Sequence, residues 1–277
     1  MKRIFLVRHG ESEANVDRSV GIHKADHAIE LTSKGCEQAA EAGFFLNRWL
    51  SDNISPQNKG KIRLWHSPYR RANQTAFYVE KECSSWIKDK REHMLLCEQQ
   101  FGLFDGIPDD KLAELFPRES AHYTKCEKHE GRFWARMPLG ESRFDVAKRV
   151  HQAFGTFHRD CDQNGIDNII VVAHGVTIRA FVMMWLHRGV EWFEKEPNPK
   201  NCSIRLIEEG VDKGYIFDGP KEPRTLLTPG TQVLVSGMKA MVTEVNARGI
   251  RVQAVGKPDN WVFNSQYVED LAGVELA

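Results

Sequence analysis

The chain has 277 residues, of which 41% are hydrophobic and 27% charged, an ordinary composition for a soluble globular protein. Lysine plus arginine equals aspartate plus glutamate at 38 each, and this balance argues against bulk nucleic-acid binding while still allowing a local cationic pocket. The apolar runs at residues 4–7 and 181–186 are far too short for a secretory signal or a membrane span. We therefore expect a protein that does not enter membranes and works in the cytoplasm.

The six cysteines follow no pattern typical of metal binding or redox chemistry. No two of them occur at C-x-x-C spacing, and a domain of this size does not need disulfides. We expect reduced thiols in a cytosolic setting.

In chain order, the first predicted element is a strand at residues 4–7, because four consecutive apolar residues are typical of a strand buried on both faces. A helix is expected from Thr32, as N-cap, to about Trp49. A second strand follows at residues 62–65. Ser67-Pro68 then predicts the start of a helix that ends near Glu82, with serine as the N-cap and proline as the first helical residue.

The second half of the main domain alternates helices and strands. Residues 101–138 are punctuated by Pro and Gly and predict loops and short helices that cover a site. Later elements are expected as a helix at 144–161, a buried strand at 168–173, a helix at 176–188 and an edge hairpin at 202–208 and 214–218. This alternation indicates the α/β class, as a three-layer α/β/α sandwich with a mostly parallel sheet.

The composition changes near residue 219. Three prolines predict a linker over residues 219–230, which would follow a main domain at 1–218. Residues 231–277 alternate apolar stretches with turns, a pattern that resembles a small SH3-like or KOW-type β-barrel. The apolar stretches fall at residues 232–235, 240–245, 250–254 and 261–263. This module is slightly acidic, so nucleic acid is a poor partner, and contact with a protein or a second copy of the chain is the better interpretation.

Two segments repeat one pattern, in which an apolar strand ends in His-Gly: His9-Gly10 and His174-Gly175. Ligands of open α/β sheets bind beyond the carboxyl ends of the strands. If the two strands are parallel neighbours, both histidines project into one crevice. A single strand-end histidine is more often a hydrogen-bonded structural residue, so the pair and its nearby arginines carry the argument for chemistry.

The first His-Gly lies in Arg8-His9-Gly10-Glu11-Ser12-Glu13-Ala14-Asn15, which resembles the R-H-G-E-S-x-x-N signature of the histidine phosphatase superfamily, the phosphoglycerate mutase-like R-H-G branch. Four further blocks match that family in order, at residues 31–35, 67–76, 96–106 and 140–142. The resemblance covers roughly residues 1–210 and implies a phosphoglycerate mutase-like fold. The C-terminal module lies outside it.

The resemblance implies that His9 attacks a phosphate ester and carries the phosphoryl group. Arg8 and Arg71 would hold the phosphoryl oxygens, with Arg70 as an adjacent competitor for the second role. Nearby guanidinium charges are expected to lower the pKa of His9 and keep it neutral. His174 would add a third donor and stay protonated beside phosphate.

Glu98 is the candidate general acid, which would protonate the leaving alkoxide and then activate water. Phosphate would also be bound by Asn15, Ser12 and Gly175. Zinc would need three or four clustered ligands, and two arginines beside the histidines would repel a cation, so we expect no metal and no other cofactor.

The predicted function is a histidine acid-type phosphatase that hydrolyses a small phosphorylated metabolite. A phosphoglycerate mutase-type phosphotransferase is one alternative, and a phosphate-recognition module without turnover is another. The stretch 21–31 is longer than the corresponding family segment, which bears on substrate choice. The candidate basic residues for binding a second anionic group are His23, Lys24, His27, Lys125, Lys128, His129, Arg132 and Arg136.

Overall fold

The structure is a computed structural model that describes residues 1–220, 232–235, 238–246, 249–254 and 274–276. The chain divides into two compact units, Met1–Pro220 and Lys221–Ala277. Among the described helices, none combines the length and apolar character that crossing a bilayer requires. All six cysteines are free thiols, as expected from their spacing.

A six-stranded sheet with the strand order β3-β2-β4-β1-β5-β6 forms the centre of the first unit. β1, β2, β3 and β4 run parallel, whereas β5 is antiparallel to β1, and β6 is antiparallel to β5. The strands are β1 (Arg3–Arg8), β2 (Ile62–His66), β3 (Ile87–Glu92), β4 (Asn168–Ala173), β5 (Ile204–Glu208) and β6 (Val211–Phe217).

This sheet is mixed, which corrects the expectation of a mostly parallel one. The edge hairpin of β5 and β6 was predicted, and its turn explains the antiparallel pairing. Glu209 and Gly210 alone join the two strands and have φ of 49° and 77°. Two consecutive positive φ values are typical of a type I′ turn, whose twist matches that of the flanking antiparallel strands.

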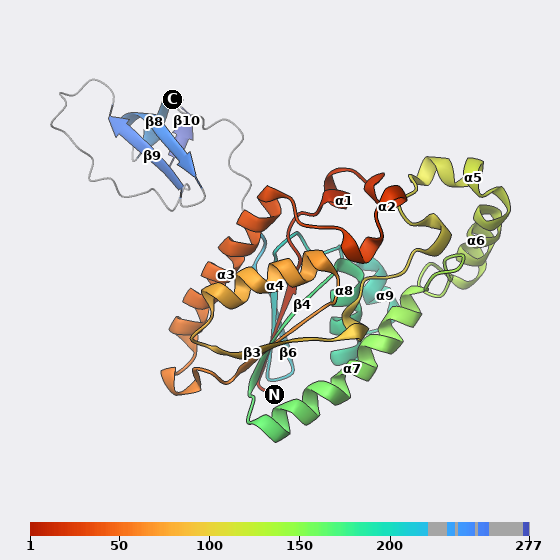
Figure 1. Ribbon diagram of the computed structural model, residues 1–277, viewed down its shortest axis with the longest axis horizontal. Helices are drawn as coiled ribbons and strands as arrows, with labels where there is room; N and C mark the ends of the chain where they lie inside the picture. The colour runs from red at the N-terminus through yellow and green to blue at the C-terminus, as the bar shows by residue number, and fades with distance from the viewer. Residues whose placement is uncertain (221–231, 236–237, 247–248, 255–273, 277) are drawn as a thin grey trace. The chain divides into compact units, whose positions relative to one another are not determined.

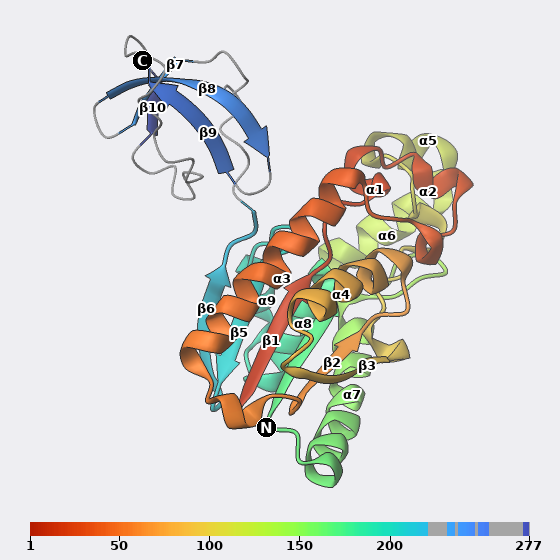
Figure 2. The same cartoon turned by 60° about the vertical axis from the view of Figure 1, so that its left-hand side comes forward.

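Helices cover both faces of the sheet and complete three layers. α3 and α4 lie over one face, and α7 and α8 lie over the other (Figures 1 and 2). The helices are α1 (Glu13–Val16), α2 (Val20–His23), α3 (Ser33–Asn53), α4 (Arg70–Glu82), α5 (Leu112–Leu115), α6 (Pro117–Glu130), α7 (Arg143–Asn164), α8 (Gly175–Trp185) and α9 (Val190–Lys195). Short 3₁₀ turns are η1 (Asp26–Ala28), η2 (Pro56–Asn58), η3 (Met94–Leu96), η4 (Gly102–Phe104) and η5 (Asp109–Lys111).

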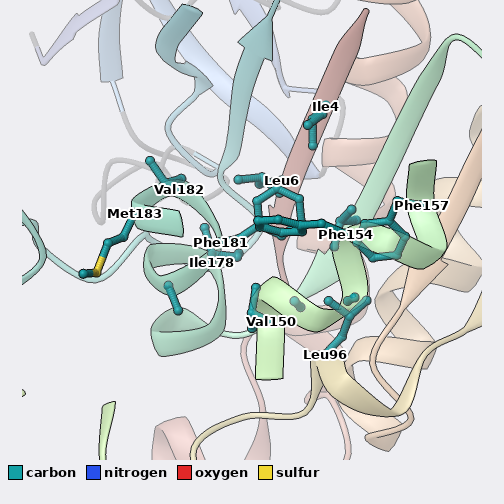
Figure 3. Close-up of a cluster of buried hydrophobic side chains, with 14 of the residues drawn as sticks. Ile4, Leu6, Leu96, Val150, Phe154, Phe157, Ile178, Phe181, Val182 and Met183 are labelled. Carbon is teal, nitrogen blue, oxygen red and sulfur yellow. The ribbon is translucent and has the colours of Figure 1, made fainter. Parts of the chain in front are cut away.

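The buried core is divided by the sheet into two clusters. Ile4 and Leu6 of β1 belong to the cluster on the α7 and α8 side, with Phe154 among its members (Figure 3). Phe5 and Val7 belong to the cluster on the α3 and α4 side. Because both faces of β1 are covered, its sequence is continuously apolar rather than alternating.

Two predicted helix starts had different outcomes. Thr32 caps α3 as expected, since its side-chain oxygen accepts a hydrogen bond from the Gly35 amide at 3.0 Å. The prediction for Ser67 was wrong, because α4 begins at Arg70 and its N-cap is Tyr69. Ser67 stays outside the helix, and its hydroxyl lies 2.8 Å from Nε2 of His174.

β3 was not predicted from the sequence. Five of its six residues are polar, and it lies at the edge of the sheet. An edge strand tolerates such polar side chains, which also discourage pairing with another chain. The sequence pattern therefore resembled a loop.

The helices of the 101–138 region lie at one end of the first unit. α5 and α6 gather there with α1 and α2, at the end to which β1 points, whereas the N-terminus lies at the opposite end (Figure 2). The expectation of loops and short helices is confirmed for this region, although α6 is a full helix of 14 residues. These segments therefore gather at the carboxyl ends of β1 and β4.

The described strands of the second unit form an antiparallel sheet with the order β10-β7-β8-β9. They are β7 (Gln232–Val235), β8 (Met238–Asn246), β9 (Gly249–Ala254) and β10 (Val274–Leu276). Three of these strands coincide with predicted segments. The predicted segment 261–263, most of the predicted linker and the turn at 236–237 lie outside the described residues.

Candidate active site

The parallel pairing of β1 with β4 brings the two His-Gly turns together. Arg8 lies opposite Ala173 in the register, so the next residue of each strand is a histidine. The rings of His9 and His174 have centroids 5.1 Å apart and an interplanar angle of 60°. The expectation that the two strands are parallel neighbours is confirmed, and both histidines are almost completely buried.

His9 has a defined tautomer in this arrangement. Its Nδ1 lies 2.7 Å from the main-chain oxygen of Gly10. A carbonyl oxygen only accepts hydrogen bonds, so Nδ1 must carry the proton, and Nε2 of the neutral ring holds the lone pair. Burial lowers the pKa of His9 well below its ordinary value, and the charges of Arg71 and Arg8 lower it further. The ring is therefore neutral and presents Nε2 as a nucleophile.

Gly10 is required by packing against the start of α3. A Cβ on Gly10 would lie 2.4 Å from the carbonyl oxygen of Gly35, closer than real side chains approach. The Gly10 amide also donates to Oγ1 of Thr75 at 3.1 Å. These contacts hold the turn that follows His9.

His174 is held between Ser67 and Tyr69. Its Nε2 lies 2.8 Å from the Ser67 hydroxyl, and its ring packs edge-on against Tyr69 with centroids 5.1 Å apart. Burial lowers the pKa of His174 well below its ordinary value, with Arg71 as the next cause. Burial therefore favours the neutral ring, whereas the expected protonated form concerns His174 beside bound phosphate and stays a prediction.

Arg71, rather than Arg70, lies beside the histidines. The Arg71 side chain is 7% exposed, whereas that of Arg70 is 62% exposed. Arg71 also stacks over the Tyr69 ring at 5.0 Å. Arg70 instead pairs with Glu30 at 2.6 Å and lines an open surface groove of about 700 Å³ beside α4. That groove contains none of the predicted catalytic residues.

Arg8 is held by a segment that is distant in the sequence. Its Nη1 donates to the main-chain oxygen of Pro199. Burial lowers the pKa of Arg8, while the charge of Glu98 opposes that shift and so places Glu98 near the same cluster. Within the described residues, the buried Nε of Arg8 and Nδ1 of His174 have no hydrogen-bond partner. Such buried polar atoms are costly unless a ligand satisfies them.

Glu98 lies at the N-terminus of α8, the helix that begins directly after His174. Its carboxylate accepts hydrogen bonds from the amides of Gln99 at 2.9 Å and Val176 at 3.3 Å. Helix N-termini attract negative groups in this way because their first amides have no helical partner.

Arg149 of α7 holds the chain on which Glu98 lies. It donates to the main-chain oxygens of Leu95, Cys97 and Glu98 at 2.8 to 2.9 Å. Its other contacts are to the Glu141 carboxylate at 2.8 and 3.0 Å. This network fixes the main chain of Glu98 without using its carboxylate.

The predicted phosphate-binding residues lie at the same end of β1. Ser12 is buried, and its hydroxyl and amide both donate to Oδ1 of Asn15. That oxygen also accepts from Nδ2 of Asn201 at 3.1 Å. Because the side-chain oxygen of Asn15 already accepts three hydrogen bonds, its NH₂ group is left to donate to a ligand. Gly175 is the first residue of α8, and a Cβ there would lie 3.1 Å from Oδ1 of Asn198.

The structure therefore groups all five predicted catalytic residues at one end of the sheet, with the three predicted phosphate-binding residues beside them. Sequence reasoning missed several contributors, namely Asp26, Ser67, Tyr69, Arg149 and Asn201. Ser67 and Tyr69 belong to a block that had been matched to the family, so that block was the available signal. Asp26 lies in the stretch 21–31, whose length was the available signal. Arg149 and Asn201 had none, because their partners are distant in sequence.

This arrangement is suited to phosphoryl transfer. A neutral imidazole provides a nucleophile, two guanidinium groups match the oxygens of a phosphoryl group, and a carboxylate lies nearby. Among the residues that the structure describes, no group of three or more His, Cys, Asp or Glu side chains could hold a metal ion.

Residues 4–216 match the family model of the Histidine phosphatase superfamily (branch 1), and the chain belongs to this superfamily. It is 36% identical over 223 residues to phosphoglycerate mutase-like protein AT74 of Arabidopsis thaliana, covering 77% of this chain and 67% of that protein. It is 25% identical to the broad-range acid phosphatase DET1 of Saccharomyces cerevisiae, covering 74% of this chain and 84% of that protein.

The fold is similar to that of solved structures. One is a mycobacterial glucosyl-3-phosphoglycerate phosphatase complexed with VO3, with a TM-score of 0.56, 23% identity, and coverage of 74% of this chain and 90% of that one. Another is mycobacterial hydrolase 2, with a TM-score of 0.59, 20% identity, and coverage of 81% of this chain and 94% of that one. At these identities the likeness shows a common fold.

Proposed function

We propose that this protein is a phosphomonoesterase that acts on a small phosphorylated metabolite through a covalent phosphohistidine at His9. The observation that carries the proposal is the hydrogen bond from Nδ1 of His9 to the Gly10 carbonyl, which leaves the lone pair on Nε2. Membership of the superfamily and relatives named as phosphatases support the reaction type.

In the first step, Nε2 of His9 attacks phosphorus, and the bond from phosphorus to the ester oxygen breaks. Arg8 and Arg71 hold the phosphoryl oxygens, and the unpartnered Nδ1 of His174 adds a further contact. Glu98 gives its proton to the leaving alkoxide. Positioning and charge stabilisation account for most catalysis of phosphoryl transfer, which explains why this chemistry needs several fixed cations.

In the second step, Glu98 takes a proton from water, which attacks phosphorus. The bond from phosphorus to Nε2 breaks, inorganic phosphate forms, and His9 returns to its neutral state. Asn15, Ser12 and the start of α8 at Gly175 are the further proposed phosphate contacts. His9 is restored without a cofactor, because the attack of water breaks the bond between phosphorus and Nε2.

Trapping the phosphoenzyme tests the proposal. Acid-labile, base-stable label should appear on the wild-type chain after rapid quenching with a radiolabelled phosphate ester. His9→Ala should form no label and lose turnover of p-nitrophenyl phosphate by about 10⁴-fold or more, on the order of the loss when a covalent nucleophile is removed.

His66→Gln is the matched control, because His66 is also a buried strand-end histidine whose Nδ1 lies 2.8 Å from the main-chain oxygen of the next residue, Ser67. It should still form the phosphoenzyme. Full turnover by His9→Ala would refute the covalent mechanism, and binding of phosphate without turnover by the wild type would favour a recognition module.

A phosphotransferase of the mutase type remains the alternative reaction, favoured by the name of the Arabidopsis relative. Incubation with 2,3-bisphosphoglycerate and 3-phosphoglycerate distinguishes the two. A phosphatase releases inorganic phosphate, whereas isomerisation without net phosphate release would contradict our proposal.

We also propose that residues 231–277 form a small SH3-like barrel that contacts a protein partner or a second copy of the chain. We propose further that the protein works in the reducing cytoplasm. The antiparallel pairing of β7, β8 and β9 and the free thiols support these two proposals. Comparing the full chain with a variant ending at residue 220 tests the first. An oligomer or complex formed by the full chain should be lost in the shorter one.

A further inference from the structure

Asp26 occupies an unusual position for an acidic residue, directly against the phosphate-binding arginine. It lies in η1, within the stretch 21–31 that is longer than the family pattern. Nη1 of Arg71 donates to its main-chain oxygen at 2.7 Å and to its carboxylate at 2.8 Å. The Asp26 side chain is only 22% exposed. A negative charge is therefore built into the edge of the phosphate site.

A second carboxylate, Asp105, lies at the same edge. The two segments meet at Gly21 and Gly106, where a Cβ on Gly21 would lie 2.9 Å from the Cα of Gly106. Burial raises the pKa of Asp105, the charge of Asp26 raises it further, and Arg71 opposes both. Only glycine allows this close approach, so the local packing keeps the two acidic segments together.

Two of the basic residues near this edge are already paired with acids. Lys24 lies 2.6 Å from Glu13 and 3.6 Å from Glu30, and Arg70 also pairs with Glu30. Two basic residues of the 101–138 region behave similarly, with Arg132 paired with Glu127 and Arg136 with Asp145. The hypothesis that Lys24, Arg132 and Arg136 read a second anionic group is therefore weakened.

The charges of these side chains limit which esters the site can bind. The two negative charges of a phosphate monoester would meet the two guanidinium groups of Arg8 and Arg71. Because the Asp26 carboxylate already pairs with Arg71, the two guanidinium groups less this carboxylate leave one positive charge for the phosphate and none for the remainder of the substrate. A further anionic group on that remainder would be repelled, whereas hydroxyl or ammonium groups would be accepted.

We propose that Asp26 determines specificity by excluding phosphate esters whose leaving group carries a second negative charge, so that the substrate is a hydroxylated or cationic monoester. This inference rests on the proposed phosphatase function. Asp105 reinforces the same selection from the facing segment.

Two small esters of similar size test it on the full chain: glycerol 3-phosphate and 2-phosphoglycolate. In the wild type, kcat/KM for phosphoglycolate should be at least about 10-fold below that for glycerol 3-phosphate. In Asp26→Asn, kcat/KM for phosphoglycolate divided by kcat/KM for glycerol 3-phosphate should rise by about 10-fold. The amide keeps an oxygen for Arg71 but removes the charge. The main-chain contact from Arg71 remains in this variant.

Asp109→Asn is the matched control, because it removes one negative charge from an exposed position in η5. It should leave the ratio at the wild-type value. Asp26→Ser provides a second charge-removing variant, and melting temperatures verify that each variant is folded. An unchanged ratio in folded Asp26→Asn and Asp26→Ser, with both esters hydrolysed, overturns this inference and leaves the phosphatase proposal standing. Absence of phosphate release from every ester by the wild type contradicts the phosphatase proposal instead.

Discussion

The side-chain amide of Asn201 donates to the main-chain oxygen of His9 at 3.0 Å, although the two residues are 192 positions apart. The same oxygen accepts from the Cys202 amide at 3.3 Å. These contacts connect the segment before β5 to the turn that presents the proposed nucleophile. Asn201 therefore acts as a positioning residue for His9.

Asn201→Ala should lower kcat by about 10-fold with little change in KM, since small displacements of a nucleophile cost rate more than binding. Rapid-quench measurement of phosphoenzyme formation, together with the melting temperature, checks this expectation. Asn53→Ala, at an exposed position of α3, is the control and should match the wild type. A kcat within twofold of wild type for folded Asn201→Ala would show that His9 is positioned without it.

Glu98→Gln should affect esters according to the basicity of their leaving group. An alkoxide needs a proton as it departs, whereas p-nitrophenolate is stable without one, so kcat/KM should fall by about 10²-fold or more for β-glycerol phosphate and far less for p-nitrophenyl phosphate. Steady-state kinetics with both esters gives the comparison. Equal losses for the two esters would assign Glu98 a structural role, like that of the nearby Glu141 on Arg149.

Stability should fall as the pH is lowered below about 6.5, the ordinary pKa of histidine. The pKa values of His9, His174, His66 and His93 are all lowered in the folded protein, with burial as the leading cause. Between each lowered pKa and the ordinary value, the unfolded chain binds more protons than the folded one. The fully buried His9 and His174 can thus each add up to about 1.4 kcal/mol per pH unit to the slope, and the more solvated His66 and His93 add less.

Urea unfolding between pH 8 and pH 5 measures this slope. The contribution of each group is fully present above the ordinary pKa and is lost as the pH falls toward the folded pKa. His9→Asn should show a shallower slope than the wild type across this interval. An identical slope would mean that His9 has the same pKa in both states.

Arg63→Met should destabilise the first unit without touching the site. Arg63 is completely buried and donates to both carboxylate oxygens of Asp160, at 2.6 and 2.9 Å. Removing one partner of a buried ion pair typically costs 3–5 kcal/mol, and about 3 kcal/mol is expected because Asp160 retains contacts with Arg91 and Asn164.

Urea denaturation at pH 7.5 gives the free energy of unfolding for this comparison. The double variant Arg63→Met with Asp160→Leu should recover part of the loss, because no unpaired charge stays buried. A loss by Arg63→Met of less than about 1 kcal/mol would indicate that Asp160 is solvated in the folded protein.

Much of the fold followed from local patterns. The apolar run of β1, the cap at Thr32 and the helical stripe of α7 each predicted an element that the structure contains. Local signals were insufficient where tertiary contacts intervene. Ser67 has the sequence of a helix cap, yet its hydroxyl contacts His174 across 107 positions of the chain. β3 has a single apolar residue, Ile87, because it lies at a sheet edge.

The sequence by itself determined the candidate chemistry, since Arg8, His9 and His174 lie in short motifs whose residue types and order are legible without coordinates. Only the tertiary structure decided how those residues are charged and what surrounds them. The lowered pKa of His174 depends on burial, and the contact of Asp26 with Arg71 joins segments 45 positions apart. Electrostatics depend on distance in space, which the pairing of β1 with β4 and the packing of η1 establish, and no local pattern encodes such distances.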